Sequence, residues 1–424
     1  MKAFFVALML GALATAAFAG EFVPAPADRV PGQHIVVFHA GSPASQVAHS
    51  LAAAHGAAVG WTYRYALNGA LFVGLSDAAA RALANNPNVL RVEEDGVVGL
   101  VATQTNPPSW GLDRIDQRAL PLDNSYTYNF DGSGVDVWII DTGIRSTHVD
   151  FGGRATKDFD SVGDGQNGND CHGHGTHVAG TTAGASYGVA KNATIHAVRV
   201  LDCGGSGTWA GVIAGVDYVT GQIQGNPGAL YVANMSLGGG ANQSADDAVN
   251  NSVAAGVFYA IAAGNSNADA CNFSPARAAQ AYCVASSTIT DARSSFSNFG
   301  TCVEIFGPGS SITSAWNTSD TATNTISGTS MASPHVAGVA ALVRDEFPAF
   351  TVSQVKQEIT TRATCNVITS PGTGTPNKLV YSLSGTDPNC GGGPGCLDPG
   401  QPCTDNIQCC SNRCKGKPGA KTCK

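Results

Sequence analysis

Residues 135–143 read VDVWIIDTG, and this stretch decides the architecture expected for the chain. An apolar run rich in β-branched residues that breaks at Thr-Gly is typical of a buried strand. The strand ends in Asp141, so a carboxylate is expected at its carboxyl end. A buried aspartate in such a place is often only a turn cap, and its meaning depends on the rest of the chain.

Two later segments carry the side chains that this carboxylate would need for nucleophilic catalysis. Residues 173–180, GHGTHVAG, place His174 at the entry to a small-residue helix, and residues 328–338, GTSMASPHVAG, place Ser330 at the start of an apolar helix. A serine hydroxyl is a poor nucleophile at neutral pH and needs a base and a carboxylate that orients that base. Each residue alone also suits a structural role, whereas the three together indicate a catalytic triad.

The three segments, in the order Asp, His, Ser, resemble the signature blocks of the subtilisin-like serine peptidases. Residues 110–118, WGLDRIDQR, and residues 233–240, ANMSLGGG, are similar to the proteinase K branch and closest to the aqualysin-like secreted enzymes. The resemblance extends over residues 102–384. It implies an α/β fold in which helices flank a mostly parallel sheet.

The resemblance also implies a role for each polar residue of the site. Ser330 is the nucleophile, His174 the base, and Asp141 the group that orients the imidazole. Asn265, which follows the strand-like residues 257–264, is implied as the side-chain donor to the oxyanion, opposite the Ser330 N–H. An ordinary Gly-Asn turn is the alternative for Asn265.

Two further histidines, His177 and His335, lie in the same motifs. The resemblance gives neither of them the role of the base, and both are expected to be structural.

Substrate binding is expected along two backbone segments that resemble the edges with which an extended peptide pairs. The pocket for the residue before the scissile bond contains no charged group and is expected to accept a large apolar or aromatic side chain. Trp209 either walls a further apolar pocket or packs on its own loop. The implied substrate-binding residues are Gly205, Ser206, Gly207, Trp209, Ser236, Leu237, Gly238, Ala262, Ala263 and Gly264.

The N-terminal part of the chain is expected to be removed in two steps. Residues 1–19 combine Met-Lys, an apolar stretch and a small-residue end, which is the pattern of a secretory signal peptide. Residues 20–101 are similar to the inhibitory propeptide of subtilisin-like zymogens, which implies self-cleavage between Val101 and Ala102. A permanent N-terminal binding domain is the alternative. The elements expected here are strands over residues 34–38, 70–75 and 89–95 and helices over residues 44–55 and 77–85.

Composition is compatible with an exported protein. The charged fraction of 13% is about half of the usual 25%. The net charge of −8 gives no reason to expect nucleic acid as a partner. No run after the signal peptide reaches the roughly eighteen apolar residues of a membrane span. A secreted, monomeric enzyme without a membrane span is therefore expected.

Thirteen cysteines in a chain with an export signal indicate an oxidising compartment and a disulfide framework. Two bridges of the catalytic region are implied by the resemblance, and the pairing of Cys283 with Cys365 is an expectation outside the family pattern. Cys390 makes the count odd, so it is free, bonded to another chain, or the partner of Cys283 or Cys365. The expected bridges are Cys171–Cys203, Cys271–Cys302 and Cys283–Cys365.

Six cysteines after a Gly/Pro linker at residues 385–395 follow the spacing C-x6-C-x5-CC-x3-C-x8-C, which is similar to inhibitor cystine knots. Six cysteines allow fifteen pairings, and sequence alone does not choose among them. Zinc is the rival explanation, but residues 384–424 contain neither histidine nor a C-x2-C pair. The knot resemblance would join Cys396 to Cys410, Cys403 to Cys414 and Cys409 to Cys423.

The function of the module at residues 396–424 stays open. Five basic side chains against two acidic ones suit an anionic surface, a polysaccharide, a peptidase or a channel as its partner. A stable terminal tag that resists proteolysis is an equal alternative.

Ca²⁺ is the one cofactor expected. Oxygen-bearing side chains crowd into residues 113–125, which suits Ca²⁺ and matches a calcium loop of the aqualysin-like enzymes, although ordinary surface carboxylates form the same pattern. A second family site would use two backbone carbonyls and a carboxylate, where this chain has Glu304 in place of the family's Asp. The implied ligands are Asp113, Asp116, Gln117, Asp123 and Ser125 in the first site and Gln280, Tyr282 and Glu304 in the second.

The sequence as a whole predicts a secreted serine endopeptidase of broad specificity, made as a self-processing zymogen. Its partners are protein and peptide substrates and its own propeptide as an intramolecular inhibitor. The rival is a binding or toxin-like protein in which the knot is the active part and the peptidase domain a carrier. The full catalytic set argues against this rival, because a carrier has no need of it.

Overall fold

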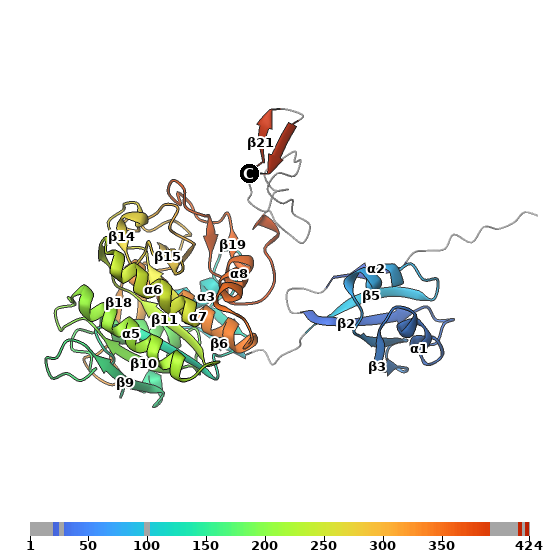
Figure 1. Cartoon of the computed structure of the whole chain (residues 1–424), viewed down its shortest axis with the longest axis horizontal. Coiled ribbons are helices and arrows are strands. Elements are labelled where there is room, and N and C mark those ends of the chain that lie inside the picture. Colours follow the sequence, from blue (N-terminus) through green and yellow to red (C-terminus); the bar gives the residue numbers. More distant parts are fainter. Residues whose placement is uncertain (1–19, 25–28, 97–101, 391–413, 418–419, 424) are drawn as a thin grey trace, which may run out of the picture. The chain divides into compact units, whose positions relative to one another are not determined.

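The computed structural model describes residues 20–24, 29–96, 102–390, 414–417 and 420–423 (Figure 1). The predicted signal peptide lies outside the described residues, as does at least one cysteine of every predicted knot pair. None of the helices in the described ranges is long and apolar enough to cross a membrane.

The chain divides into two compact units, residues 1–99 and 100–424. In the first, a five-stranded sheet has the order β1-β5-β2-β4-β3. One face of this sheet and two helices enclose a core in which Val36, Phe72 and Val92 are fully buried. The elements are β1 (Glu21–Val23), β2 (Arg29–Phe38), α1 (Ala44–Ala54), β3 (Ala58–Tyr63), β4 (Gly69–Val73), α2 (Asp77–Leu83) and β5 (Val89–Gly96).

The three strands and two helices expected in this unit are present, but two strands were missed. β3 pairs with β4 and has a register shift between Val59 and Trp61, which blurs the alternation of buried and exposed residues by which strands are found. β1 is only three residues long and pairs with β5 in parallel. Neither strand carries a pattern long enough to detect.

A nine-stranded sheet forms the centre of the second unit, with the order β19-β20-β16-β15-β13-β11-β8-β10-β9. All neighbours are parallel except β19 and β20. The unit therefore has the subtilisin-like α/β architecture expected from the sequence. The strands are β8 (Val135–Asp141), β9 (Ala155–Asp160), β10 (Thr194–Arg199), β11 (Leu230–Met235), β13 (Phe258–Ala262), β15 (Tyr282–Ser287), β16 (Ile305–Pro308), β19 (Thr364–Cys365) and β20 (Lys378–Leu379).

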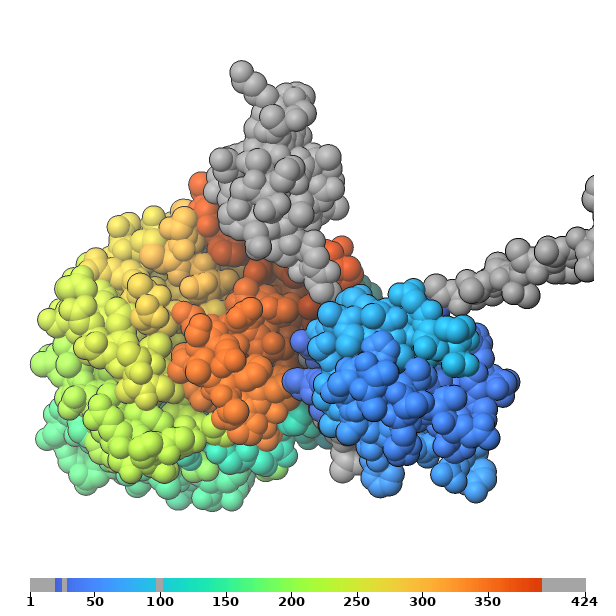
Figure 2. All heavy atoms as spheres, turned by 45° about the vertical axis from the view of Figure 1, so that its right-hand side comes forward, coloured from blue at the N-terminus to red at the C-terminus, as the bar shows by residue number. Residues whose placement is uncertain are grey.

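β11 and β13 bury almost every side chain along their length. Both faces of this sheet are therefore covered, and helices provide the cover. α7 packs against α4 and several central strands, and α5 packs against α6. Figure 2 shows green, yellow and orange parts of the chain sharing the surface of this unit. The helices are α3 (Trp110–Ile115), α4 (His174–Ala183), α5 (Trp209–Gly225), α6 (Gln243–Ala255), α7 (Thr329–Glu346) and α8 (Val352–Arg362).

Short elements complete the unit around the large sheet. Three two-stranded pairings, β6 with β7, β12 with β14 and β17 with β18, are antiparallel. The remaining elements are β6 (Ala102–Thr105), β7 (Ser125–Tyr128), η1 (Val149–Phe151), β12 (Gly239–Gly240), η2 (Ala270–Asn272), β14 (Phe273–Ser274), β17 (Ile312–Ala315), β18 (Thr323–Ile326) and η3 (Pro388–Cys390).

Disulfides join Cys171 to Cys203 and Cys271 to Cys302, the two pairs implied by the resemblance. The expected bridge between Cys283 and Cys365 is wrong. Cys365 bonds to Cys390 instead, and Cys283 is a free thiol buried in β15. Burial raises the pKa of the Cys283 thiol well above its ordinary value, so this thiol stays protonated.

Contacts of the segment before Cys390 explain this bridge. The backbone N–H of Cys365 donates to Asp387 Oδ2 at 2.8 Å, and Asn366 Nδ2 donates to the Asn389 carbonyl at 2.7 Å. These bonds bring Cys390 to the edge strand β19. Residues 385–390, assigned to a linker from their composition, therefore belong to the packed unit.

Two strands of the C-terminal module are described, β21 (Cys414–Lys417) and β22 (Ala420–Cys423), and they pair antiparallel. Cys414 and Cys423 are opposite each other in this pairing. The hairpin is compatible with a small disulfide-rich module.

Candidate active site

Asp141 and His174 form a hydrogen-bonded pair at the carboxyl end of β8. The two carboxylate oxygens lie 2.8 and 3.0 Å from His174 Nδ1. The Asp141 side chain is fully buried, whereas that of His174 is 20% exposed and lines a cleft. Because Asp141 holds Nδ1, Nε2 is the nitrogen left to take a proton.

Two glycines let the start of α4 pack closely against Trp316 and against the backbone that follows β8. Gly173 has a φ of +114°, and a Cβ there would lie 2.4 Å from the Trp316 ring. A Cβ on Gly175 would lie 2.2 Å from the carbonyl oxygen of Gly143. Larger residues at either position would displace His174 from Asp141.

The electrostatic surroundings favour the charged form of His174. Burial opposes a charge on the imidazole, but the charge and hydrogen bond of Asp141 and the charge of Asp170 outweigh it. The pKa of His174 is therefore raised above its ordinary value. This shift stabilises the imidazolium that a general base becomes when it accepts a proton.

Ser330 lies in the first turn of α7, which follows the extended backbone of Gly328. Its hydroxyl donates to the Ser236 carbonyl at 3.1 Å, and among the described residues no hydrogen bond joins it to His174. Ser236 Oγ in turn donates to the Ser330 carbonyl at 2.7 Å. The Ser330 hydroxyl is thus bonded to a backbone carbonyl of the segment 236–238, and a hydrogen bond to His174 would need another side-chain rotamer of Ser330.

Two hydrogen-bond donors converge beside Ser330. Asn265 Oδ1 accepts from the backbone N–H and the hydroxyl of Thr329, at 2.8 and 2.9 Å, which orients the amide so that Nδ2 is left for a ligand. A Cβ built on Gly328 would lie 3.5 Å from Ser330 N and 3.6 Å from Asn265 Nδ2. Both nitrogens therefore lie near one point, which is the placement that an oxyanion hole requires.

Comparison with known proteins assigns the residues that build this site to a family. The model of the subtilase family, Peptidase_S8, matches residues 132–391. The chain belongs to the subtilase family. It is accordingly a subtilisin-like serine endopeptidase.

Relatives of this subtilase are peptidases by name, and one of them is named as an extracellular enzyme. Alkaline serine exoprotease A of Vibrio alginolyticus is 53% identical over 329 residues, 76% of this chain but only 60% of that protein's length. The extracellular serine proteinase of Thermus sp. (strain Rt41A) is 47% identical over 376 residues, 84% of this chain and 90% of the relative. A crystal structure of a cold adapted subtilisin-like serine proteinase is 54% identical with a TM-score of 0.61, covering 65% of this chain and 98% of that one.

The other two histidines of the subtilase motifs are buried. His177 Nε2 lies 3.0 Å from the Ile312 carbonyl, and His335 Nδ1 lies 2.9 Å from the Met331 carbonyl. Burial lowers the pKa of each to about 4. Both rings are neutral at neutral pH, and His177 joins α4 to β17 whereas His335 bonds a carbonyl of its own helix.

The residues expected to bind substrate lie around two adjoining hollows. A cleft of about 470 Å³ is lined by Gly205, Ser206, Gly207, Trp209 and His174. A pocket of about 370 Å³ is lined by Ala262, Ala263, Gly264, Asn265 and Ser330. Ser236, Leu237 and Gly238 line both hollows and so connect them.

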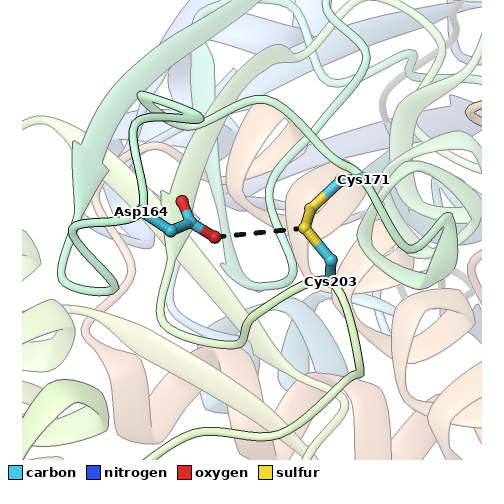
Figure 3. Close-up of side chains that lie close together, drawn as sticks. All are labelled: Asp164, Cys171 and Cys203. Carbon is cyan, nitrogen blue, oxygen red and sulfur yellow. Dashed lines mark hydrogen bonds between the residues drawn. A yellow bond between two sulfur atoms is a disulfide. The ribbon is translucent and has the colours of Figure 1, made fainter.

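A disulfide ties the loop before His174 to the edge of the cleft. Cys171 bonds to Cys203 next to Asp164 (Figure 3). The fully buried Arg199 donates to both oxygens of Asp164, at 2.6 and 2.7 Å. Although Asp164 and the two sulfurs are close enough for a metal, the sulfurs are bonded to each other and offer no thiolate. The disulfide and the Arg199–Asp164 ion pair therefore have a structural role and hold these loops together.

The first predicted calcium site gathers its residues without bringing their carboxylates into one cage. Among the described residues, Asp113, Asp116 and Asp123 do not form a group of ligand atoms within 4.8 Å of one another. Asp113 accepts backbone N–H bonds from Asp123 and Asn124, at 3.2 and 2.9 Å.

Gln117 and Ser125 are tied into the same loop. Gln117 Oε1 accepts from the Asp123 N–H at 3.2 Å, and Ser125 donates to Asp123 Oδ1 at 2.6 Å. Asp116 Oδ1 is buried without a partner. Burial, and then the charges of Asp123 and Asp113, raise the pKa of Asp116 to about 7. The Asp116 oxygen without a partner, close to the charges of Asp113 and Asp123, is chemically suited to bind a cation.

The second predicted calcium site does not fit a metal ion. Lys356 on α8 donates from Nζ to the carbonyls of Gln280 and Ala281, both at 3.1 Å. Burial lowers the pKa of Lys356, while the charge of Glu304 opposes this change. The ammonium group, rather than a metal ion, therefore interacts with Gln280, Ala281 and Glu304 and lies close to the ring of Tyr282.

Two polar residues of the site were not identified from the sequence. Asp170 and Thr142 are buried polar residues next to His174 and Asp141. Asp170 precedes His174 by four residues in DCHGH, and a carboxylate just before a helix is a recognised capping signal. The Lys356 contact had no signal, because residues 356 and 280 are far apart in sequence.

Proposed function

We propose that this subtilase is a secreted endopeptidase of broad specificity that is made as a self-processing zymogen. The observation that carries the proposal is the Asp141–His174 pair placed with two convergent donors at Asn265 and Ser330. A hydroxyl, a base, an orienting carboxylate and an oxyanion hole are together the set that acyl transfer from a peptide needs.

In the proposed mechanism, Ser330 Oγ leaves the Ser236 carbonyl and attacks the peptide carbonyl carbon while His174 Nε2 takes its proton. Asp141 keeps the proton on Nδ1 and stabilises the imidazolium. Asn265 Nδ2 and the Ser330 N–H donate to the oxyanion of the tetrahedral intermediate. His174 then gives its proton to the leaving amine, and water releases the acyl group by the same route.

The pocket next to Ser330 supports a preference for apolar or aromatic residues before the scissile bond. None of its lining residues is charged, and Ala262, Ala263, Phe273 and Ala276 supply apolar walls. A basic side chain there would lose its hydration without gaining an ion pair, which is costly. The main-chain edges at residues 205–207 and 236–238 would hold the peptide backbone and tolerate many sequences.

The N-terminal unit supports the zymogen part of the proposal. It has its own core, so it is able to fold as a separate body, and it ends close to Ala102, where the second unit begins with β6. N-terminal sequencing of the secreted protein should give Ala102-Thr103-Gln104. A Ser330→Ala chain should remain at precursor length, because the cleavage is its own.

We also propose Ca²⁺ at the Asp113–Ser125 loop. Subtilases commonly bind structural calcium, and the orphaned Asp116 Oδ1 offers an oxygen of the kind that Ca²⁺ prefers. Chelation should lower the melting temperature of the wild type. Lys356→Met should leave this response intact, because its ammonium belongs to the other site.

The peptidase activity is tested with chromogenic peptides that differ only in the residue before the cut. The mature enzyme should hydrolyse the phenylalanine peptide well and the lysine peptide poorly, and a serine-directed covalent inhibitor should abolish both activities. Asn265→Ala should reduce kcat about 100- to 1,000-fold with little change in KM. An inactive enzyme after confirmed removal of residues 20–101 would contradict the proposal.

A further inference from the structure

Asp170 is a second buried carboxylate beside the triad. It is 8% exposed and lies on the loop that leads into α4. Five donors surround its two oxygens, so the carboxylate is held in one orientation. They are Thr142 Oγ1 (2.9 Å), His172 N (2.9 Å) and Gly173 N (2.8 Å) on Oδ1, and Thr176 N (2.9 Å) and Thr176 Oγ1 (2.6 Å) on Oδ2.

These bonds connect the two halves of the Asp141–His174 pair. Thr142 follows Asp141, and its N–H donates to Asp141 Oδ1 at 2.7 Å. The Thr142 hydroxyl donates to Asp170 and accepts from the N–H of Gly175 at 2.9 Å. The residues before and after His174 are thus both fixed to the end of β8 through one hydroxyl and one carboxylate.

The carboxylate also contributes its charge. Asp141 on β8, Asp170 and His172 on the preceding loop, and His177 on α4 are the titratable groups that surround the His174 ring in the described residues. Asp170 adds a negative charge at the N-terminus of α4, where the helix dipole favours one. That charge favours the imidazolium in the same sense as Asp141 does.

We propose that Asp170 is a positioning residue of this peptidase. It fixes the backbone that carries His174 relative to Asp141 and stabilises the imidazolium formed when Ser330 loses its proton. It touches neither substrate nor the reacting atoms. The proposal rests on the peptidase mechanism given above and extends it to a residue outside the triad.

The test is Asp170→Asn in the full-length chain, assayed after maturation and normalised by active-site titration with the covalent inhibitor. We expect kcat to fall about 10- to 100-fold with KM nearly unchanged, because small misplacements of a catalytic group are costly. The acid limb of the kcat–pH profile should move to lower pH. Its direction follows from the lost negative charge, which lowers the pKa of His174.

Asp150→Asn is the matched control. Asp150 is 4% exposed and lies at the opposite end of α4, where it accepts from the Ser186 N–H at 2.6 Å. Its removal should lower thermal stability but leave kcat and the acid limb in place.

Thr142→Val and Thr142→Ser separate geometry from charge. The valine variant breaks the bridge but keeps the Asp170 charge, so kcat should fall while the acid limb stays. The serine variant keeps the hydroxyl and should retain wild-type kcat.

An Asp170→Asn enzyme with wild-type kcat and an unmoved acid limb overturns the proposal. If this variant does not fold, Thr142→Val decides, and unchanged kcat in that variant overturns the positioning role. An inactive wild type would instead contradict the peptidase function itself.

Discussion

β8 carries a carboxylate near each end, each paired with an imidazole from another element, and only one of these pairs belongs to the active site. At the carboxyl end, Asp141 holds Nδ1 of His174. At the other end, His196 on β10 has Nε2 3.2 Å from Asp136 and Nδ1 3.2 Å from Asp158. The same chemical pair therefore occurs twice on one strand in different surroundings.

The difference lies in the second ring nitrogen. Burial opposes a charge on His196, but the hydrogen bonds and charges of Asp136 and Asp158 raise its pKa to about 9. Its ring also stacks on Trp138, with centroids 4.1 Å apart. His196 is thus charged at neutral pH with both nitrogens occupied, and it cannot act as a base. An imidazole becomes a catalyst only when one nitrogen remains available.

The largest expected difference between the two ends of β8 is in the effect on kcat when the carboxylate at each end is replaced. Asp141→Asn should reduce kcat about 10,000-fold, because the amide no longer holds the required tautomer of His174. Asp136→Asn should leave kcat within about twofold of wild type. Steady-state hydrolysis of a chromogenic peptide measures both, and comparable losses in the two variants would show that the ends are not functionally distinct.

The second prediction concerns stability. His196→Gln should lower the free energy of unfolding by about 2–3 kcal/mol, because the partly exposed carboxylates of Asp136 and Asp158 lose the hydrogen bonds of their cationic partner. Urea unfolding is measured in the inactive Ser330→Ala background, which prevents autolysis. Activity of the His196→Gln enzyme with an intact Ser330 should match wild type.

The raised pKa of His196 should make the free energy of unfolding depend on pH. Its folded-state pKa of about 9 exceeds the ordinary value near 6.5, so the stabilising contribution is complete below about pH 6.5 and is lost as pH rises through 9. The loss should be on the order of 1–2 kcal/mol, given partial solvent exposure. The His196→Gln chain should show a flatter profile over this range, and parallel profiles would contradict the assignment.

Asp158→Asn should produce the smallest effect. With Asp136 still present, the pKa of His196 should fall but stay above its ordinary value. We expect a loss of about 1 kcal/mol, or a few degrees in melting temperature. If Asp158→Asn costs as much as His196→Gln, the two carboxylates do not act independently.

The sequence was sufficient where a feature depends on a short contiguous pattern. β8 and the glycine-flanked His174 and Ser330 all come from such patterns, and the family match follows from them. Features that depend on contacts between distant segments were not predictable. Cys390 meets Cys365 because Asp387 binds the edge strand, and Lys356 reaches Gln280 from a helix 76 residues further along the chain.

The role of Asp170 and the strand β3 were not predicted for other reasons. Asp170 was visible in the sequence, but its importance comes from five donors that only the folded loop assembles. β3 was hidden because a register shift disturbs its alternation. Buried polar networks and irregular strands are determined by tertiary structure rather than by local propensity.

The bridge between Cys365 and Cys390 determines what happens when a peptidase, including another copy of this enzyme, cleaves the chain between these two cysteines. The segment between these cysteines includes the exposed residues Thr373 and Gly374. A single cut anywhere in residues 366–389 leaves both fragments joined through sulfur. The C-terminal module therefore stays attached to the enzyme after such a nick, and separating the two fragments then requires a reductant.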